Sequence, residues 1–217
     1  MSQELRYILA MSCIIPGIVG LCLYRKMQPQ YHLLVYMMFS DATIETIVFI
    51  GKKFKSFEFF ATLCSNAYIL ISFVLYLSFV KNNGYIKNKL RRYFIVVACL
   101  FIAYNWYQIG VVNDFLLSLC FISAVCFFIA IHILSLQITA IHTRIKRNFW
   151  FWASCLFTIQ YAYSFLTFGF YILNLSELLG GSNIGLFQLV VNVIYYCAFA
   201  VIMFLIPLKK LTVVHQD

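Results

Sequence analysis

Seven long apolar runs, separated by short polar loops, constrain what this chain can fold into. The hydrocarbon core of a bilayer is about 30 Å thick, and about 20 helical residues cross it at a rise of about 1.5 Å each. Each run meets or approaches that length. The runs cover residues 7–24, 31–50, 59–80, 93–110, 115–137, 149–171 and 184–208. We therefore predict an all-α polytopic membrane protein, a bundle of seven transmembrane helices that forms a single domain over residues 1–217.

The composition excludes the other fold classes. Hydrophobic residues make up 64% of the 217 residues and charged residues 11%, whereas soluble domains average about 45–50% and about 25%. A soluble fold could not cover so much apolar surface, and a disordered chain would be far less hydrophobic. No loop exceeds about a dozen residues, so there is no room for a soluble catalytic domain. The lipid bilayer is the expected surrounding of most side chains.

The first apolar run stands where a secretory signal peptide would stand. It is too long for the apolar region of such a peptide, it lacks an A-x-A cleavage site, and Arg25 and Lys26 follow it directly. Pro16 in its middle is tolerated in a membrane helix and can kink it. We expect this run to be retained as the first transmembrane helix.

Lysine and arginine residues predict the orientation, because they gather on the cytoplasmic side of membrane proteins. The loops after the first, third and fifth runs, together with the C-terminal tail, hold about twelve of them, against about four on the other side. The larger group consists of Arg25, Lys26, Lys81, Lys87, Lys89, Arg91, Arg92, Arg144, Lys146, Arg147, Lys209 and Lys210. The N-terminus is therefore expected outside and the C-terminus in the cytoplasm. The lysines of the 51–58 loop disagree with this pattern, and anionic headgroups could accommodate them.

The net charge of +9 suggests nucleic-acid binding at first sight. A nucleic-acid binder gathers its basic side chains on one soluble face. Here they lie in short segments between apolar runs, as topology signals do. We expect no nucleic-acid partner.

The sequence contains no pattern typical of an enzyme or a metal site. All eight cysteines lie within apolar runs, none forms a C-x-x-C pair, and no His or Asp stands at zinc-ligand spacing from two of them. Buried free cysteine behaves as a small hydrophobe. No Gly-x-Ser-x-Gly or His-Glu-x-x-His motif is present. We expect no catalytic residue, no metal and no cofactor, and we interpret His132 as a core histidine rather than a proton relay.

Several aromatic residues fall near the ends of the predicted spans. Amphipathic rings anchor membrane helices at the headgroup level, so these residues predict an interfacial belt. They are Tyr104, Trp106, Tyr107, Trp150, Trp152 and Tyr171.

Asp41 and Glu45 in the second run are the most informative polar residues. An acidic side chain near the bilayer centre costs on the order of 2.5–3.5 kcal/mol on insertion scales, so it needs a compensating role. The i, i+4 spacing puts both on one helix face, about 6 Å apart along the axis. We expect at least one carboxyl to be protonated, because a like charge and a low dielectric both favour the neutral form.

Four amides share a depth with this acidic pair. Counted from the span midpoints, Asp41 and Gln160 are central, Glu45 lies about 7 Å toward the outside, and the remaining three amides about 5–6 Å. We predict a ligand- or proton-binding pocket open to the outside, formed by Asp41, Glu45, Asn66, Asn105, Gln160 and Asn192. The alternative is that the amides make separate interhelical hydrogen bonds, each worth about 0.6 kcal/mol.

Three features resemble a family of seven-helix inner-membrane proteins of Bacteroidota-type bacteria. They are an opening helix with Pro16 that leads into the segment 23–29, an acidic residue in the second helix at Glu45, and the aromatic segment 148–152 followed by Tyr161 and Tyr163. The resemblance extends over most of the chain. It implies the inner membrane as the location and gives no established activity.

Three functions are compatible with these patterns. A sensory or signalling accessory protein would bind a small ligand or proton in the outer half, and a cytoplasmic or membrane protein partner would dock on the segments 81–92 and 138–147. A small-solute transporter or a proton- or ion-conducting pore would use the intramembrane carboxylates, although neither repeats nor broken helices are evident. An intramembrane enzyme would need a catalytic motif that is not found.

Overall fold

The computed structural model describes residues 11–54, 57–109, 116–140, 148–173 and 181–208. Over these residues it contains seven α-helices, three single-turn 3-10 helices and no β-strand. The α-helices are α2 (Ile14–Leu23), α3 (His32–Lys53), α4 (Glu58–Asn82), α5 (Asn88–Ile109), α6 (Leu116–Ala140), α7 (Phe149–Ile172) and α8 (Gly181–Leu205). The 3-10 helices are η1 (Met11–Cys13), η2 (Tyr24–Lys26) and η3 (Pro29–Tyr31).

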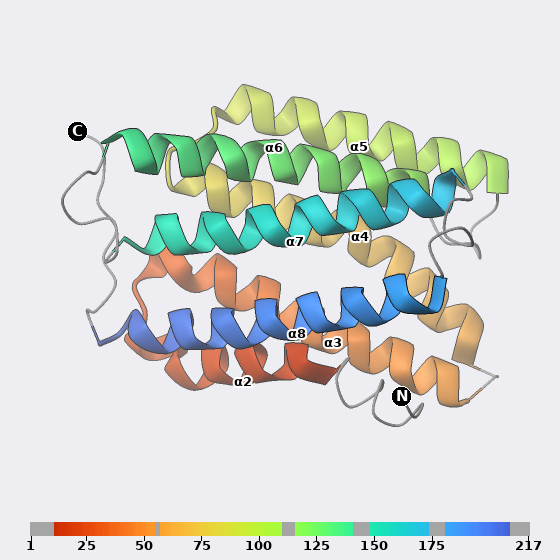
Figure 1. The fold of residues 1–217 in the computed structure, drawn as a ribbon, viewed down its shortest axis with the longest axis horizontal. Helices are drawn as coiled ribbons and strands as arrows, with labels where there is room; N and C mark the ends of the chain where they lie inside the picture. Colours follow the sequence, from red (N-terminus) through yellow and green to blue (C-terminus); the bar gives the residue numbers. More distant parts are fainter. Residues whose placement is uncertain (1–10, 55–56, 110–115, 141–147, 174–180, 209–217) are drawn as a thin grey trace.

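Successive helices run in opposite directions along the long axis, so the bundle has two distinct ends (Figure 1). The turns from α2 to α3 and from α4 to α5 lie at the same end, drawn on the left, where α7 begins and α8 finishes. We call it the basic end, because its described residues include Arg25, Lys26, Lys81, Lys87, Lys89, Arg91 and Arg92. The opposite end carries η1 and the start of α4.

The seven helices close into a ring. Each packs against its neighbours in sequence, and α8 returns to contact α2. Glycines in α2 allow this closure, because a Cβ on Gly20 would lie 2.5 Å from Cε of Met203 in α8 and 3.0 Å from Cγ1 of Val35 in α3. A Cβ at Gly20 would therefore require the end of the Met203 side chain to move and Val35 to give way, and glycine avoids both where α2 sits between α3 and α8.

Aromatic side chains fill the basic half of the ring. Tyr76 of α4 meets Phe157 of α7 edge-on, with ring centroids 5.1 Å apart, and Phe157 lies 5.0 Å from Phe199 of α8. Phe79 stacks on Trp150 at 4.8 Å. All five side chains are buried, and such ring pairs contribute about 0.5–1.5 kcal/mol beyond the area they bury. We call Tyr76, Phe79, Trp150, Phe157 and Phe199 the aromatic core.

Trp150 corrects the prediction of an interfacial belt. It is 1% exposed, whereas Tyr104, Trp106, Tyr107 and Trp152 are exposed as a belt residue would be. The reason is local. Trp150 is the second residue of α7 and faces inward, against Phe79 and against Tyr85 of the α4–α5 turn, whose ring centroid lies 4.6 Å away.

The outer surface is apolar, as a surface in contact with lipid must be. Val96 and Leu100 of α5, Phe128 of α6 and Ile194 of α8 are each more than half exposed, whereas soluble monomers rarely expose contiguous apolar patches beyond a few hundred Å². Within the described ranges, four helices are long and apolar enough to cross a membrane, namely Pro29–Gly51, Glu58–Asn82, Leu116–Thr139 and Phe149–Ile172. The chain is therefore helical, with the surface and the spans of a membrane protein.

The other three helices, α2, α5 and α8, are shorter or less continuously apolar than these four. α2 has ten residues and covers about 15 Å. α5 begins with Lys89, Arg91 and Arg92 within its first turns, and the apolar stretch of α8 is Leu189–Leu205. The predicted spans at these places stay predictions. The beginning of the first span (7–10), the 111–114 division, the segment 141–147 and the basic residues of the tail lie outside the described residues.

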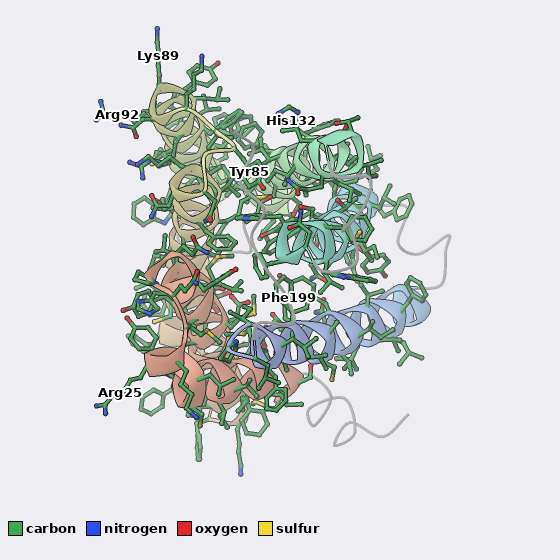
Figure 2. All side chains as sticks on the ribbon, turned by 90° about the vertical axis from the view of Figure 1, so that its left-hand side faces the viewer. Arg25, Tyr85, Lys89, Arg92, His132 and Phe199 are labelled. Carbon is green, nitrogen blue, oxygen red and sulfur yellow. The ribbon has the colours of Figure 1, made fainter. Side chains whose placement is uncertain are left out.

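The turn after α4 fixes the position of Tyr85. Gly84 has a φ of +84°, which favours glycine, and its N–H donates to the carbonyl of Lys81 over 3.0 Å. The N–H of Tyr85 donates to the carbonyl of Val80 over 3.2 Å. These two bonds make a Schellman ending. This ending directs Tyr85 back toward the bundle (Figure 2).

Candidate functional site

Asp41, in the middle of α3, faces α8 across the inside of the ring. The hydroxyl of Tyr196 donates a hydrogen bond to Oδ2 of Asp41 over 3.4 Å. Both residues are half-buried. α2 packs against α3 and α8 alike, so the carboxyl lies where three helices meet.

Glu45 and Cys13 complete the surroundings of Asp41. Glu45 follows one helical turn after Asp41 and interacts electrostatically with it, and both carboxyls interact with the thiol of Cys13 at the end of η1. Cys13 is fully buried. Beside it, the hydroxyl of Ser12 is buried and has no hydrogen-bond partner among the described residues. We call Asp41, Glu45, Cys13 and Tyr196 the acidic site.

Tyrosines border the acidic site on the side of the aromatic core. Asp41 interacts electrostatically with Tyr161 of α7 and Tyr195 of α8. The hydroxyl of Tyr76 donates to the carbonyl of Cys126 in α6 over 3.3 Å, and the Tyr161 hydroxyl interacts with the Cys126 thiol. Phenol hydroxyls from three helices thus meet near the centre of the bundle.

Gln160 and Asn192 form a second polar group beside the acidic site. The side-chain amide of Gln160 in α7 donates to Oδ1 of Asn192 in α8 over 2.8 Å. Asn192 precedes Tyr196 by one helical turn, toward the opposite end. Oε1 of Gln160 is buried without a hydrogen-bond partner in the described part of the chain, so this pair keeps an acceptor available.

Asn105 and Asn66 lie on other helices. Nδ2 of Asn105 in α5 donates to Oγ of Ser118 in α6 over 2.5 Å, and among the described helices α5 packs against α4 and α6. This is a separate interhelical hydrogen bond of the kind that the alternative interpretation predicts. Asn66 is 5% exposed on α4. Of the six predicted residues, the structure therefore brings Asp41 together with Glu45, pairs Gln160 with Asn192, and turns Asn105 toward α6.

Some residues of the site were absent from the predicted set. In the sequence Cys13 and Cys126 are indistinguishable from small apolar residues of a membrane helix. Their spacing does not separate them from the other six cysteines. Tyr76 lies nearer the C-terminal end of the 59–80 run than the predicted pocket residue Asn66 does. His132 is a correction, because it is exposed on the outer face of α6 and is not a core residue (Figure 2).

No metal-binding cluster of three His, Cys, Asp or Glu side chains occurs among the described residues. All eight cysteines lie in the described ranges and are free thiols. No known family model, no curated protein and no solved structure matches this chain.

Proposed function

We propose that this chain is a seven-span protein of the bacterial inner membrane that binds a proton or a small cationic ligand in the outer half of its bundle. In this proposal it acts as a sensory or signalling accessory protein and passes the change to a cytoplasmic or membrane protein partner. The observation that carries the proposal is the position of Asp41, beside Tyr196 and next to a closed aromatic core. The location in the inner membrane follows the family resemblance.

The seven-span topology is supported by the closed ring. α2, α5 and α8 lie alongside the four helices that are long and apolar enough to cross a membrane, and they alternate in direction with them (Figure 1). The alternation brings Arg25 and Lys26 to the same end as the 81–92 segment. Under the positive-inside rule this end is cytoplasmic, so the acidic site, which lies between that end's aromatic core and η1, belongs to the outer half.

The chemistry of the acidic site favours a proton or a cation. A carboxylate at this depth costs several kcal/mol unless its charge is balanced. In the described ranges, every lysine and arginine lies near a helix end, so none lies beside Asp41 in the middle of α3. The hydroxyl of Tyr196 offers a dipole but no positive charge. A bound proton or a small cation would supply the missing charge.

The aromatic core favours binding over conduction. Toward the basic end, Met38 lies about one turn from Asp41, Phe199 about one turn from Tyr195, and Phe157 fills the space between them on α7. These three side chains are at most 1% exposed. A proton or ion that crosses the bundle would need several of them to move together, because protein interiors are close-packed.

The second candidate function is a small-solute transporter or a proton- or ion-conducting pore. One observation favours it, namely the two carboxyls on one face of α3 that point toward the same neighbours, since intramembrane carboxylates often mark ion and proton paths. The two candidates differ in whether anything crosses the aromatic core.

A reconstitution experiment separates the two functions. In proteoliposomes, infrared difference spectra between acidic and neutral pH are expected to show the carbonyl band of a protonated carboxyl, which Asp41→Asn removes and Glu58→Gln, at the exposed start of α4, retains. Proton and alkali-cation flux is expected to equal that of protein-free liposomes. Flux that Asp41→Asn abolishes would establish the transporter, and spectra without a pH-dependent carboxyl band would overturn proton binding.

The signalling role needs its own test. A photo-crosslinking amino acid at position 87, on the exposed α4–α5 turn, is expected to capture a defined membrane or cytoplasmic protein in native membranes. The yield of that product should change at least several-fold in Asp41→Asn, because binding at the acidic site is proposed to control the basic end. A product whose yield is the same in both proteins would overturn the signalling role and leave ligand binding intact.

A further inference from the structure

A groove of about 310 Å³ runs between α2 and α3 on the outside of the ring. Its rim is formed by Ile18, which is 56% exposed, and Phe39, which is 46% exposed. Its floor lies where Gly17 meets Ala42, because a Cβ on Gly17 would stand 3.3 Å from Cβ of Ala42. The volume is at the lower end of the range of about 300–1,000 Å³ typical of ligand sites. The groove fits a narrow occupant.

The lining of the groove offers no free hydrogen-bond donor. Its two hydroxyls belong to Thr43 and Thr46, and each donates to a backbone carbonyl one turn earlier on α3, at 2.9 Å and 2.8 Å. The remaining lining residues are glycine and apolar side chains. A polar occupant would therefore lose its hydrogen bonds to water without replacing them. The occupant must be a hydrocarbon segment.

The groove and the step from it to Arg25 together have about the length of one leaflet. Its α2 side extends from Ile14 to Leu21, about 10 Å along the axis, and Arg25 follows about 6 Å further. The total of about 16 Å is close to half of a hydrocarbon core of about 30 Å. Ile14, Ile18, Leu21 and Arg25 follow each other at spacings of four, three and four residues, so they form one stripe that leads from the groove to the basic end.

Basic and hydroxyl-bearing side chains gather where this stripe ends. The hydroxyls of Tyr24 and Tyr36 lie 2.6 Å apart, which joins the end of α2 to α3, and the ring of His32 stacks on Tyr24 at 4.0 Å. Arg25 and Lys26 are exposed, and Figure 2 shows Arg25 projecting away from the bundle. The described acidic residues are Asp41, Glu45 and Glu58, none of which lies at this end. The local charge is therefore positive and uncompensated.

We propose that the groove between α2 and α3 binds one acyl chain of an acidic phospholipid, whose headgroup lies against Arg25, Lys26 and the Tyr24–Tyr36 pair. The lining of the groove requires an apolar occupant of this length, and the positive charge at the basic end requires a negatively charged headgroup. This inference is independent of what the acidic site binds, because its residues lie on the outer face of α2 and α3.

Native mass spectrometry of the full chain from mixed nanodiscs tests the proposal. The probe is an equimolar mixture of phosphatidylglycerol and phosphatidylcholine with identical acyl chains. The wild-type chain is expected to retain one phosphatidylglycerol in preference to phosphatidylcholine. Arg25→Gln with Lys26→Gln should reduce that preference by about thirtyfold, since each of the two basic residues near a membrane surface contributes about 1 kcal/mol and about 1.4 kcal/mol is tenfold.

The matched control carries the same loss of charge at the same end of the bundle. Lys89→Gln with Arg92→Gln acts on α5, well away from Arg25 (Figure 2), and is expected to leave the preference unchanged. A third variant, Thr43→Trp, fills the groove and should reduce retention of the lipid with either headgroup. Equal loss in both charge variants would mean a diffuse surface potential and would overturn the site, as would an unchanged preference in Arg25→Gln/Lys26→Gln.

Discussion

The hydroxyl of Tyr196 on α8 lies 3.4 Å from Oδ2 of Asp41 on α3, although the two residues are 155 positions apart in the sequence. The contact crosses the inside of the ring next to α2, which packs against both helices. It therefore links the last helix of the bundle to the helix that carries the acidic pair. A change in the charge of Asp41 would act on α8 through this contact first.

The coupling between Asp41 and Tyr196 can be measured by a double-mutant cycle. Asp41→Ala, which leaves no side-chain oxygen to accept the bond, and Tyr196→Phe should be non-additive by about 0.5–1 kcal/mol in the free energy of unfolding, because interhelical hydrogen bonds in membranes average about 0.6 kcal/mol. The measurement is reversible unfolding in detergent micelles. The control cycle pairs Asp41→Ala with Tyr104→Phe on the exposed face of α5 and should be additive. A coupling within error of zero would show that the hydrogen bond between Tyr196 and Asp41 does not contribute to stability.

A buried amide network at the basic end is expected to be important for stability. Oδ1 of Asn148 accepts a bond from the backbone N–H of Trp150 over 2.9 Å, its Nδ2 donates to Gln137, and Nε2 of Gln137 donates to the Tyr85 hydroxyl over 2.8 Å. Gln137 and Asn148 are fully buried. The network joins α6, the start of α7 and the turn after α4.

Asn148→Ala should therefore destabilise the fold by about 2–4 kcal/mol. It removes an N-cap, worth about 1 kcal/mol, and leaves the buried Oε1 of Gln137 without its donor, which costs about 1–3 kcal/mol. Asn82→Ala, an exposed residue at the end of α4, should change the free energy of unfolding by less than about 0.5 kcal/mol. Similar unfolding curves for the two variants would contradict a structural role for the network.

The positions of helices α4 and α7 along the sequence could be predicted well. The runs at 59–80 and 149–171 correspond to α4 (Glu58–Asn82) and α7 (Phe149–Ile172), because the length of an apolar run is set by the thickness of the bilayer and is visible without any tertiary information. The i, i+4 spacing likewise placed Asp41 and Glu45 together, because a helix face is a local property.

The rotation of each helix and the identity of its neighbours could not be predicted in the same way. Asn105 has the depth of the acidic site, but α5 turns it toward Ser118 of α6. Trp150 stands at a span end, but it faces inward onto Phe79, and His132 faces outward. Depth is counted along the chain, whereas these outcomes depend on which side chains of different helices pack together.

Substitution by alanine should change the free energy of unfolding in opposite directions at two helical glycines, Gly20 and Gly169. Gly20→Ala should destabilise the fold by about 1–3 kcal/mol, because its Cβ would displace Cε of Met203 and press on Cγ1 of Val35. Gly169→Ala in α7 should stabilise it by about 0.5–1 kcal/mol, since no atom lies within 4 Å of the added Cβ and alanine is the better helix former. Thermal unfolding of both variants measures this, and a stabilising Gly20→Ala would show that α2 does not need glycine to close the ring.

Tyr85 gives the fold a dependence on alkaline pH. Burial raises the pKa of Tyr85 above that of an unfolded tyrosine, so the folded state holds this proton more tightly than the unfolded state. Its contribution is fully present below about pH 10, the ordinary pKa of tyrosine. It is lost as the pH rises further, toward the raised pKa.

Tyr85→Phe tests this assignment. At about pH 8 the variant should be less stable by about 1–3 kcal/mol, because the amide of Gln137 loses its acceptor. The difference should shrink between about pH 10 and about pH 11, where the wild-type chain loses the contribution of the neutral phenol. Urea or guanidinium unfolding across this range measures both values, and a difference that stays constant with pH would show that Tyr85 does not ionise on unfolding.

Accessibility labelling distinguishes seven spans from four. In a cysteine-free background, Phe54→Cys, Lys87→Cys and Asn113→Cys place one thiol after each of α3, α4 and α5 in the sequence. If α3, α4 and α5 all cross, an impermeant maleimide added to right-side-out vesicles should label positions 54 and 113, and position 87 only after permeabilisation, because the basic end is expected in the cytoplasm. The start of α5 carries Lys89, Arg91 and Arg92, which suits a headgroup region and leaves the apolar remainder of this helix for the bilayer. Labelling of positions 87 and 113 from the same side would show that α5 does not cross the membrane. Labelling of position 87 alone would show that the protein has the opposite orientation.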